Sequence, residues 1–427
     1  MKILIVGKGA REHAFAWKIA QSPKITQLYA APGSPGIAQY AECVDLSDSD
    51  FDGLIGLVQK EQIDLTLVGP EIPLAEGIVD RFQEAGLTIF GPTQAAAQIE
   101  ADKDFALELM HKYDIPTGAY ATFTEPEPAR EYIREKGVPI VLKASGLAAG
   151  KGVLICHTLD EALQGVEEIV VDQAFGEAGN KLVVMEYLEG EEASIFAFTD
   201  GEDLVYLLPA QDHKTIDEGD VGLNTGGMGA YAPAPVVTPE LMQEAQDRIM
   251  APTVKALAKE GRPYKGILYL GLILTADGPK VIEFNCRLGD PEAQVVLPLL
   301  KTDLVDILTA VCNSTVKDLN IELDNRAATT VVMASGGYPE AYETGFPIKG
   351  LDEAEALGDV VIFHAGTGAQ NSTLVTGGGR VLAVTAMAND IPSAISHAYK
   401  AVDQISFQGH YFRKDIGHRA LARLEPV

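Results

Sequence analysis

Over the first hundred residues, short apolar runs alternate with longer runs in which apolar residues recur at helical spacing. The apolar runs predict four strands, at residues 2–6, 27–31, 64–68 and 87–90. The longer runs predict helices between them, near residues 11–21, 51–61 and 72–85. Buried strands joined by crossover helices form a parallel sheet that is covered on both faces. The pattern therefore predicts a Rossmann-like α/β unit.

The middle of the chain has a more varied pattern. A helix is predicted to begin at Asp102, because Asp is a good N-cap and apolar residues follow at helical spacing. Another helix is expected near 158–172 and a longer one at 239–260, among strands at residues 139–143, 152–156, 182–187, 192–200 and 204–210. Residues 267–275 and 280–285 then predict a hairpin, since the Asp277-Gly278 pair between them is a turn signal.

The last hundred residues return to strand-like runs, at 328–335, 360–366 and 380–387, and end in a helix near 391–405. A chain of 427 residues is too long for one ordinary core. The changes in pattern predict three domains, at 1–101, 102–325 and 326–427, with a lobe inserted into the second at about 120–190. The fold class that follows is α/β.

The charge balance narrows the possible partners. A net charge of −28 repels nucleic acid and anionic membranes, so neither is expected as a partner. No apolar run approaches the roughly 20 residues that a membrane span needs. The four cysteines are far apart and have no C-x-x-C spacing, which indicates reduced thiols and a cytoplasmic protein. Because the net charge is negative, any site for phosphate must rely on local basic groups, backbone N–H groups and a metal.

The first strand is followed by Gly7-Lys8-Gly9-Ala10-Arg11-Glu12, which resembles a dinucleotide fingerprint. That fingerprint needs a third glycine where Glu12 stands, and an acidic residue after the second strand, where the chain reads Ala-Ala-Pro-Gly. NAD and a dehydrogenase are therefore disfavoured. Two readings stay open for Gly7 and Gly9: a phosphate held at the helix N-terminus, or a structural tight turn.

The Gly-rich stretch KASGLAAGKGVLI (143–155) ends in Gly-Lys but is not a P-loop. A Walker A loop needs four residues between its first glycine and Gly-Lys, a following Ser or Thr, and then a helix. Here three residues separate Gly146 from Gly150, Gly152 follows Lys151, and the next residues are strand-like. The stretch predicts a strand–loop–strand hairpin with Lys143 pointing inward, whose turn either folds over phosphates or is a plain turn.

Polar residues with clear chemistry stand in three further stretches. Glu283 and Asn285 are two residues apart on a strand, so their oxygens leave the same face and suit Mg²⁺. Arg287 has the same parity, and its guanidinium suits a carboxylate or phosphoryl group. The alternative for this stretch is an ordinary strand end held by salt bridges. Residues 184–194 predict a strand that ends in acids, and two readings stay open: the acids meet an adenine and a ribose, or they are solvated at an ordinary strand end. Residues 211–231 predict a long structureless loop, and such loops are usually functional.

The motifs VGPE (68–71), KASGLAAGKGV, EYLEGEEAS (186–194), NTGGMGAY (224–231) and EFNCRLGDPE (283–292) occur in this order. Together they resemble the glycinamide ribonucleotide synthetase family, ATP-grasp ligases of purine biosynthesis, over essentially the whole chain. The resemblance implies a Rossmann-like N-terminal domain, an α+β ATP-grasp body whose inserted lobe clamps ATP between two sheets, and a small C-terminal domain.

The resemblance also implies roles for individual residues. Lys143 and Arg287 would be catalytic, and Glu283 and Asn285 would bind Mg²⁺, with Mn²⁺ as the alternative metal. The ATP site would comprise Lys103, Lys143, Ser145, Gly146, Gly150, Lys151, Gly152, Glu186, Tyr187, Leu188, Glu191 and Glu192. The sites for glycine and 5-phosphoribosylamine would comprise Gly7, Gly9, Arg11, Asp212, Lys214, Asn224, Thr225, Gly226, Gly227, Met228, Arg287 and Asp290.

Three positions depart from the family pattern. Ala10 and Ser145 stand where the family usually has Gly and Asp, and residues 269–275 offer no acid before the metal pair. The departures predict a tighter first turn, no carboxylate role at residue 145, and few protein ligands to the metal, with phosphates and water as the others. Arg380 and Arg413 are C-terminal candidates for reaching the substrate.

The implied reaction is ATP-dependent joining of glycine to 5-phosphoribosylamine by a cytoplasmic monomer. An amine cannot readily expel oxide from a carboxylate, so the γ-phosphoryl group of ATP would first convert glycine to glycyl phosphate. Two rival hypotheses remain: an ATP-grasp ligase for other substrates, which a substrate panel would reveal, and a nucleotide-binding regulator without catalysis. A regulator would not need Glu283, Asn285 and Arg287 together, so their presence favours an enzyme.

Overall fold

The computed structural model describes residues 1–148 and 152–424. The N-terminal part is a parallel sheet of order β3-β2-β1-β4-β5. Its strands are β1 (Lys2–Gly7), β2 (Gln27–Pro32), β3 (Glu42–Cys43), β4 (Leu65–Val68) and β5 (Ile89–Phe90). The crossover helices are α1 (Ala10–Ile19), α2 (Phe51–Glu61), α3 (Glu71–Ala75) and α4 (Ile78–Glu84). The predicted parallel α/β unit is confirmed, but the single helix expected at 72–85 is wrong.

That predicted helix is two helices because the chain turns at Gly77. Gly77 has φ +89°, a left-handed conformation that ends α3 and precedes α4. Glycine adopts this conformation at little steric cost, whereas the apolar periodicity on either side is continuous. The periodicity therefore indicated helix correctly but did not reveal the break.

The body of the molecule is an antiparallel sheet of order β11-β10-β16-β17. Its strands are β10 (Glu191–Thr199), β11 (Leu204–Tyr206), β16 (Gly266–Thr275) and β17 (Gly278–Asn285). The predicted hairpin is confirmed, with Thr275 opposite Gly278 at its turn. The body helices are α5 (Gln94–Ala101), α6 (Lys103–Lys112), α9 (Pro239–Ala245), α10 (Ala251–Lys259), α11 (Ala293–Val296) and α12 (Leu304–Asn313). The helix predicted at 239–260 is α9 and α10, joined through a π-helical turn at Gln246–Met250.

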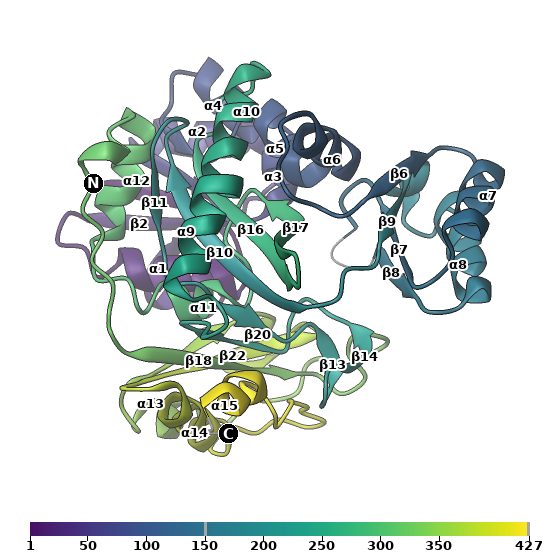
Figure 1. Ribbon diagram of the computed structural model, residues 1–427. Helices are drawn as coiled ribbons and strands as arrows, with labels where there is room; N and C mark the ends of the chain where they lie inside the picture. Colours follow the sequence, from purple (N-terminus) through teal and green to yellow (C-terminus); the bar gives the residue numbers. More distant parts are fainter. Residues whose placement is uncertain (149–151, 425–427) are drawn as a thin grey trace.

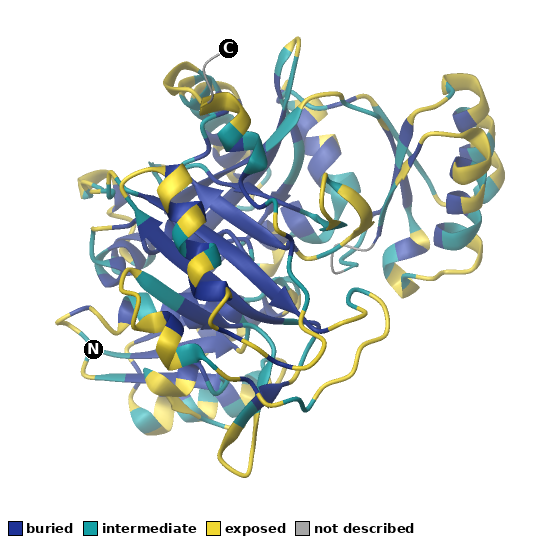
Figure 2. Cartoon of the chain, turned by 90° about the horizontal axis from the view of Figure 1, so that it is seen from below, coloured by how far each residue is buried: buried dark blue, intermediate teal, exposed yellow. Residues whose placement is uncertain are grey.

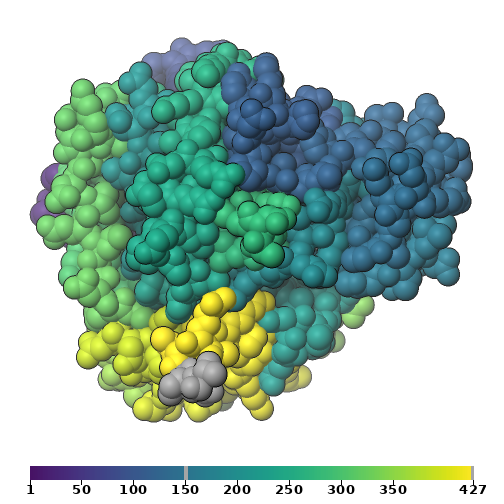
Figure 3. All heavy atoms as spheres, in the orientation of Figure 1, coloured from purple at the N-terminus to yellow at the C-terminus, as the bar shows by residue number. Residues whose placement is uncertain are grey.

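A smaller lobe, here called the lid, projects from one side of the body (Figures 1 and 3). Its sheet has the order β6-β9-β7-β8, with β6 (Tyr120–Phe123), β7 (Ile140–Ala144), β8 (Val153–Cys156) and β9 (Leu182–Glu186). Helices α7 (Pro126–Lys136) and α8 (Leu159–Val166) cover its outer face. Ile140 and Leu142 of β7 pack under these helices in a hydrophobic core of the lid's own. Since side chains alternate along a strand, Val141 and Lys143 face the other way, toward the body.

The C-terminal sheet has the order β12-β15-β18-β22-β19. Its long strands are β18 (Ala327–Ala334), β19 (Val360–His364) and β22 (Arg380–Ala388), which confirms the predicted strands. Beside them lie the hairpin β20 (Thr367–Gln370) with β21 (Thr373–Thr376) and the helices α13 (Leu351–Glu355), α14 (Ile391–Val402) and α15 (His418–Leu424). The buried strands lie at the centre of the molecule and the exposed residues on its outer helices and loops (Figure 2).

The prediction of a structureless loop at 211–231 is wrong. The segment contains β12 (Gln211–Asp212) and β15 (Gly229–Ala232), which extend the C-terminal sheet, and the hairpin β13 (Thr215–Asp217) with β14 (Val221–Asn224). β15 pairs with β18, about a hundred residues further along the chain. Such short strands are ordered by this pairing, which local sequence does not encode. The domain boundaries near 101 and 325 stay a prediction.

In the described part of the chain, no helix is both long and apolar enough to cross a membrane.

Candidate active site

A cavity of about 580 Å³ opens between the lid sheet and the body sheet. It is lined from the lid by residues of β7, β8 and β9, and from the body by β16, β17 and the segment 212–226. Most of the predicted site residues meet here: Arg11, Lys103, Lys143, Gly152, Glu186, Tyr187, Leu188, Glu192, Asp212, Lys214, Asn224, Thr225, Gly226, Glu283, Asn285, Arg287 and Asp290. Arg380 lines it as well.

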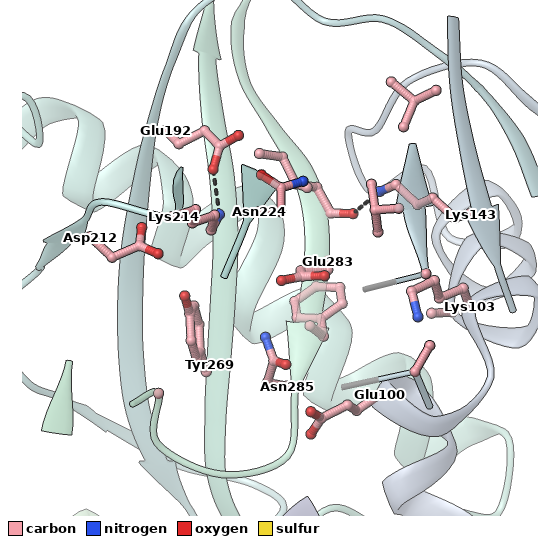
Figure 4. A pocket seen from close by; sticks show the side chains of 18 of the residues that line it. Glu100, Lys103, Lys143, Glu192, Asp212, Lys214, Asn224, Tyr269, Glu283 and Asn285 are labelled. Carbon is pink, nitrogen blue, oxygen red and sulfur yellow. Dashed lines mark hydrogen bonds and ion pairs between the residues drawn. The ribbon is translucent and has the colours of Figure 1, made fainter. Parts of the chain in front are cut away.

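Lys143 projects from β7 across the cavity toward the body (Figure 4). Its Nζ donates a hydrogen bond to the carbonyl oxygen of Ile282 at 3.1 Å. Burial lowers the pKa of Lys143 to about 8, although Glu283 opposes the shift. Lys103 is the first residue of α6 and lines the same wall. Two ammonium groups at one wall of a cavity suit a polyphosphate.

Three residues of the predicted ATP site lie outside the cavity lining and bind other parts of the chain. Ser145 does not line the cavity: its hydroxyl donates to Asp102 Oδ1 at 2.8 Å and accepts from the backbone N–H of Asp104. Glu191 does not line it either, because its carboxylate is bound by Gln211 and Arg423. Gly146 lies outside the lining and accepts a hydrogen bond from Lys103 Nζ. The predictions for Gly150 and Lys151 fall outside the described residues.

One end of the cavity has an apolar wall with a polar edge. Met185, Ile273 and Phe284 contribute to the wall, and Glu186, Tyr187 and Leu188 follow at the end of β9. The carboxylate of Glu186 accepts the backbone N–H of Ala119 at 3.0 Å, which fixes its position. An apolar slot beside a short polar segment is a common form of site for a flat heterocycle.

Glu283 and Asn285 leave β17 on the same face and point into the cavity (Figure 4). Burial favours the neutral form of Glu283, but Lys214, Lys143 and Lys103 outweigh it and lower its pKa. In the described part of the chain, no three His, Cys, Asp or Glu side chains gather as a metal cluster. A carboxylate and an amide oxygen fit Mg²⁺, which is commonly held by one or two protein groups together with water and phosphate oxygens.

Arg287 is held in place by two carboxylates. Its Nη2 lies 2.7 Å from Glu100 Oε1, and its Nε lies 3.1 Å from Glu71 Oε2. Burial opposes ionisation of Glu71, but Arg287 and Arg11 outweigh it and lower its pKa to about 2. Arg11 is also bound to Glu12. The guanidinium groups are thus oriented before any substrate binds.

The N-terminal turn does not reach the cavity. Glu12 Oε2 accepts the backbone N–H of Gly9 at 2.7 Å, so the carboxylate of α1 caps its own helix. A Cβ at Gly7 would lie 2.6 Å from Glu12 Cγ, which leaves no room for another side chain there. Neither Gly7 nor Gly9 is part of the cavity lining. The arrangement favours the structural turn over a phosphate site.

The segment that follows β12 supplies the opposite wall. Lys214 forms an ion pair with Glu192, and Thr225 Oγ1 accepts the N–H of Gly227. Arg380 Nη1 donates to the carbonyl oxygens of Gly226 and Asp290, which fastens this segment to the turn after β17.

Three predictions in this region do not match the structure. Met228 lies in the hydrophobic core of the C-terminal sheet, because its apolar side chain, directly before β15, packs inward. Gly227 lies beside Pro291 outside the lining. Arg413 is fully buried and bound to Asp220 and Asp415, so it fastens the β13–β14 hairpin.

The sequence analysis assigned no role to four polar residues that line this cavity, namely Glu71, Glu100, Tyr269 and Glu292. Glu71 and Glu292 stand in the VGPE and EFNCRLGDPE motifs, which could have drawn attention to them. Glu100 and Tyr269 lie in an ordinary helix and an apolar strand, without a local signal.

An antiparallel body sheet, a lid sheet and a cavity between them with lysines and an acid–amide pair define an ATP-grasp protein. Models of the phosphoribosylglycinamide synthetase N domain, ATP-grasp (A) domain and C domain match residues 1–100, 101–293 and 328–419. The chain belongs to the phosphoribosylglycinamide synthetase family.

Individual relatives agree with this assignment. The chain is 49% identical to a phosphoribosylamine–glycine ligase of Vibrio parahaemolyticus and 50% identical to one of Allochromatium vinosum, over 99% of each chain. The crystal structure of a phosphoribosylamine–glycine ligase from Thermotoga maritima superposes with a TM-score of 0.84 at 30% identity, covering 97% of this chain and all of that one. A biotin carboxylase of Campylobacter jejuni superposes with a TM-score of 0.71 at 15% identity, and the match covers 99% of this chain and 95% of the carboxylase chain. At this identity the likeness shows the fold alone.

Proposed function

We propose that the chain joins glycine to 5-phosphoribosylamine with ATP, giving glycinamide ribonucleotide, ADP and phosphate. The observation that carries the proposal is the arrangement of Lys143, Glu283 and Arg287 around one cavity, in a chain 49% identical to a phosphoribosylamine–glycine ligase over 99% of its length. A glycine carboxylate oxygen attacks the γ-phosphorus of ATP, and ADP leaves. The amine nitrogen then attacks the carbonyl carbon of glycyl phosphate, phosphate leaves, and the nitrogen loses a proton.

The residues of this chain would act mainly by positioning and charge neutralisation, which dominate phosphoryl transfer. Lys103 and Lys143 would bind the phosphates of ATP, and the 186–188 segment would hold its adenine. Arg287 would orient the oxygens of the carboxylate and then of the acyl phosphate. Glu283 and Asn285 would hold Mg²⁺, or Mn²⁺, which neutralises phosphate charge when it is bound.

The proposal includes a cytoplasmic monomer that uses small molecules only. The net charge of −28 supports small molecules rather than nucleic acid as partners, and four free cysteines, one of them exposed, support the cytoplasm. An oxidising compartment would favour disulfides in a protein with several cysteines.

The test is an assay of the purified chain with ATP, Mg²⁺, glycine and 5-phosphoribosylamine. ADP release is expected to depend on glycine only when the ribosylamine is present. A panel of other carboxylic acids and amines is the control, because a related ATP-grasp ligase would share the ATP site. Efficient turnover of a different acid or amine would refute the proposed substrates and leave the fold assignment intact.

A further inference from the structure

The segment 212–226, here called the wall segment, has one side toward the cavity and another side toward the C-terminal end of the chain. Asp212 and Lys214 line the cavity, whereas His213 and Thr215 bind residues just before α15. Alternate residues of an extended segment leave it on opposite faces, which explains this division. In Figure 1 the β13–β14 hairpin of the wall segment and α15 lie side by side. The cavity wall therefore has an outer support from residues far away in the chain.

The C-terminal segment, residues 411–419, binds the wall segment at many positions. Arg413 Nη1 donates to the carbonyl oxygen and to the hydroxyl of Thr215, at 3.1 and 3.0 Å. The backbone N–H of Gly417 donates to His213 Nε2 at 3.2 Å. Further hydrogen bonds join Tyr411 to Ile216, Lys414 to Glu218 and Asp415 to Gly219. The two segments are thus fastened together over most of the β13–β14 hairpin.

Three side chains of the C-terminal segment converge on the carboxylate of Asp220. Its oxygens lie 2.9 Å from Arg413 Nη2, 2.7 Å from Arg419 Nη2 and 3.2 Å from His418 Nε2. Burial opposes ionisation of Asp220, but Arg419 and Arg413 outweigh it and lower its pKa. Asp220 stands directly before β14 with φ +59°, a left-handed conformation that Asp and Asn tolerate better than most residues. Charge-assisted hydrogen bonds from two guanidinium groups therefore fix the turn of the hairpin.

The hairpin carries this constraint to the cavity. Thr215 of β13 pairs with Asn224 of β14. Thr225 donates its backbone N–H and its hydroxyl to the carbonyl oxygen of Lys214, at 2.7 and 2.8 Å. Lys214, Asn224 and Thr225 all line the cavity. A shift of the hairpin would therefore move three cavity-lining residues together.

We propose that Asp220 is a positioning residue for the ligation reaction. Through the hairpin it holds Lys214, Asn224 and Thr225 in place in the cavity wall. This inference rests on the proposed function and adds to it a residue that does not itself line the cavity. The effect of Asp220 on the rate is exerted through the backbone of the wall segment. A misplacement of about 1 Å at a reacting centre can cost about 10²-fold in rate, so the outer support of the wall matters for catalysis.

The first test is hydrogen–deuterium exchange in residues 212–226 of the full-length protein without ligands. Asp220→Asn keeps the shape of the side chain and tolerates the left-handed backbone, but it removes the charge that the two guanidinium groups bind. Exchange in the wall segment is expected to be about tenfold faster than in the wild type, since losing hydrogen bonds to a charged group makes local opening easier. An unchanged exchange rate would overturn the proposal.

Asp359→Asn is the matched control for both tests. Asp359 also has a left-handed backbone, with φ +51°, and its carboxylate also binds a guanidinium, that of Arg326 at 2.9 Å. Neither residue lines the cavity. Exchange in the wall segment and kcat should both stay at the wild-type values in this variant. An equal effect of Asp359→Asn would show that the change is not specific to the hairpin, and it would overturn the proposal.

The second test is steady-state kinetics with ATP, Mg²⁺, glycine and 5-phosphoribosylamine, at a temperature where thermal unfolding shows every variant to be folded. In Asp220→Asn, kcat should fall about tenfold or more, while KM for ATP stays within about twofold because the lid lysines are not attached to the hairpin. Arg419→Met should lower kcat as well. Arg419→Lys keeps a charged donor for Asp220, so its kcat should lie closer to that of the wild type.

A purely structural role gives a different result. In that case Asp220→Asn lowers Tm but leaves the kcat of the folded enzyme unchanged, and the proposal is overturned. Equal losses of kcat in Arg419→Met and Arg419→Lys would also contradict it, because the charge on Asp220's partner would then have no part in positioning. The proposed function fails on a separate result, namely wild-type enzyme that shows no glycine-dependent ADP release.

Discussion

Arg287 and Glu100 form a buried ion pair in which Nη2 lies 2.7 Å from Oε1, although 187 residues separate them in the chain. The other oxygen of Glu100 accepts the backbone N–H of Cys286 at 2.7 Å. Glu100 therefore binds both the side chain of Arg287 and the backbone beside it. A guanidinium held from two directions is already oriented when substrate arrives, which lowers the reorganisation needed during reaction.

Arg287→Ala is expected to abolish ligation and leave ATP binding largely intact. The substitution removes the guanidinium that would stabilise charge on the reacting carboxylate, and losing one such donor typically costs about 10²–10³ in kcat. Turnover and ATP affinity would be measured on the same preparation. Arg248→Ala, which removes a surface arginine paired with Glu244, is the control. Near-normal turnover by the Arg287→Ala enzyme would rule out this role.

Glu100→Gln should lower kcat about 10–100-fold while KM for ATP changes little, because a misplaced reacting group costs rate more than binding. Glutamine keeps the shape of the side chain but loses the charge that holds Arg287. Glu71 still binds Nε, so the variant should fold. The measurement is the split between kcat and KM in steady-state kinetics. An unchanged kcat would mean that Glu71 alone orients Arg287.

Ser145→Ala is expected to destabilise the protein by about 1 kcal/mol and to leave the ligation rate close to that of the wild type. The hydroxyl joins the end of β7 to Asp102, the N-cap of α6, but does not line the cavity. Chemical denaturation and an activity assay would measure the two effects. A large loss of rate with unchanged stability would instead place Ser145 at the ATP phosphates.

Stability is expected to fall as pH decreases below about 6.5, because His13 and His364 are buried and neutral. Burial lowers the pKa of His13 to about 3 and that of His364 to about 4. Below the unfolded-state pKa the unfolded chain binds protons that the folded chain cannot, so each histidine costs about 1.4 kcal/mol per pH unit until its folded pKa is reached.

The two histidines join the N-terminal and C-terminal parts, since His13 Nδ1 accepts the backbone N–H of His364 at 2.8 Å. Denaturation between pH 7.5 and 5 would test the prediction. His13→Asn keeps an acceptor at that position and should flatten the pH dependence. An identical slope in the variant would assign the acid sensitivity to other groups.

Local sequence was sufficient to predict those features of an element that depend only on residues close together in the chain. The N-cap at Asp102, the Asp-Gly turn between β16 and β17, and the shared face of Glu283 and Asn285 all agree with the structure. Each follows from backbone geometry within a few residues. The order of motifs along the chain was likewise enough to indicate the family.

Only the tertiary structure decided which charges meet. Glu71 and Glu100 reach Arg287 across 216 and 187 residues, and the carboxylate of Asp212 on β12 points toward Tyr269 on β16. The strand period fixes the face from which a side chain leaves, but domain packing fixes what it faces. The sequence by itself therefore determined most of the elements, the family and the shared face of Glu283 and Asn285. The partners of Arg287 and the surroundings of the Asp212 carboxylate depend on how three parts of the chain pack together, and no local pattern encodes that packing.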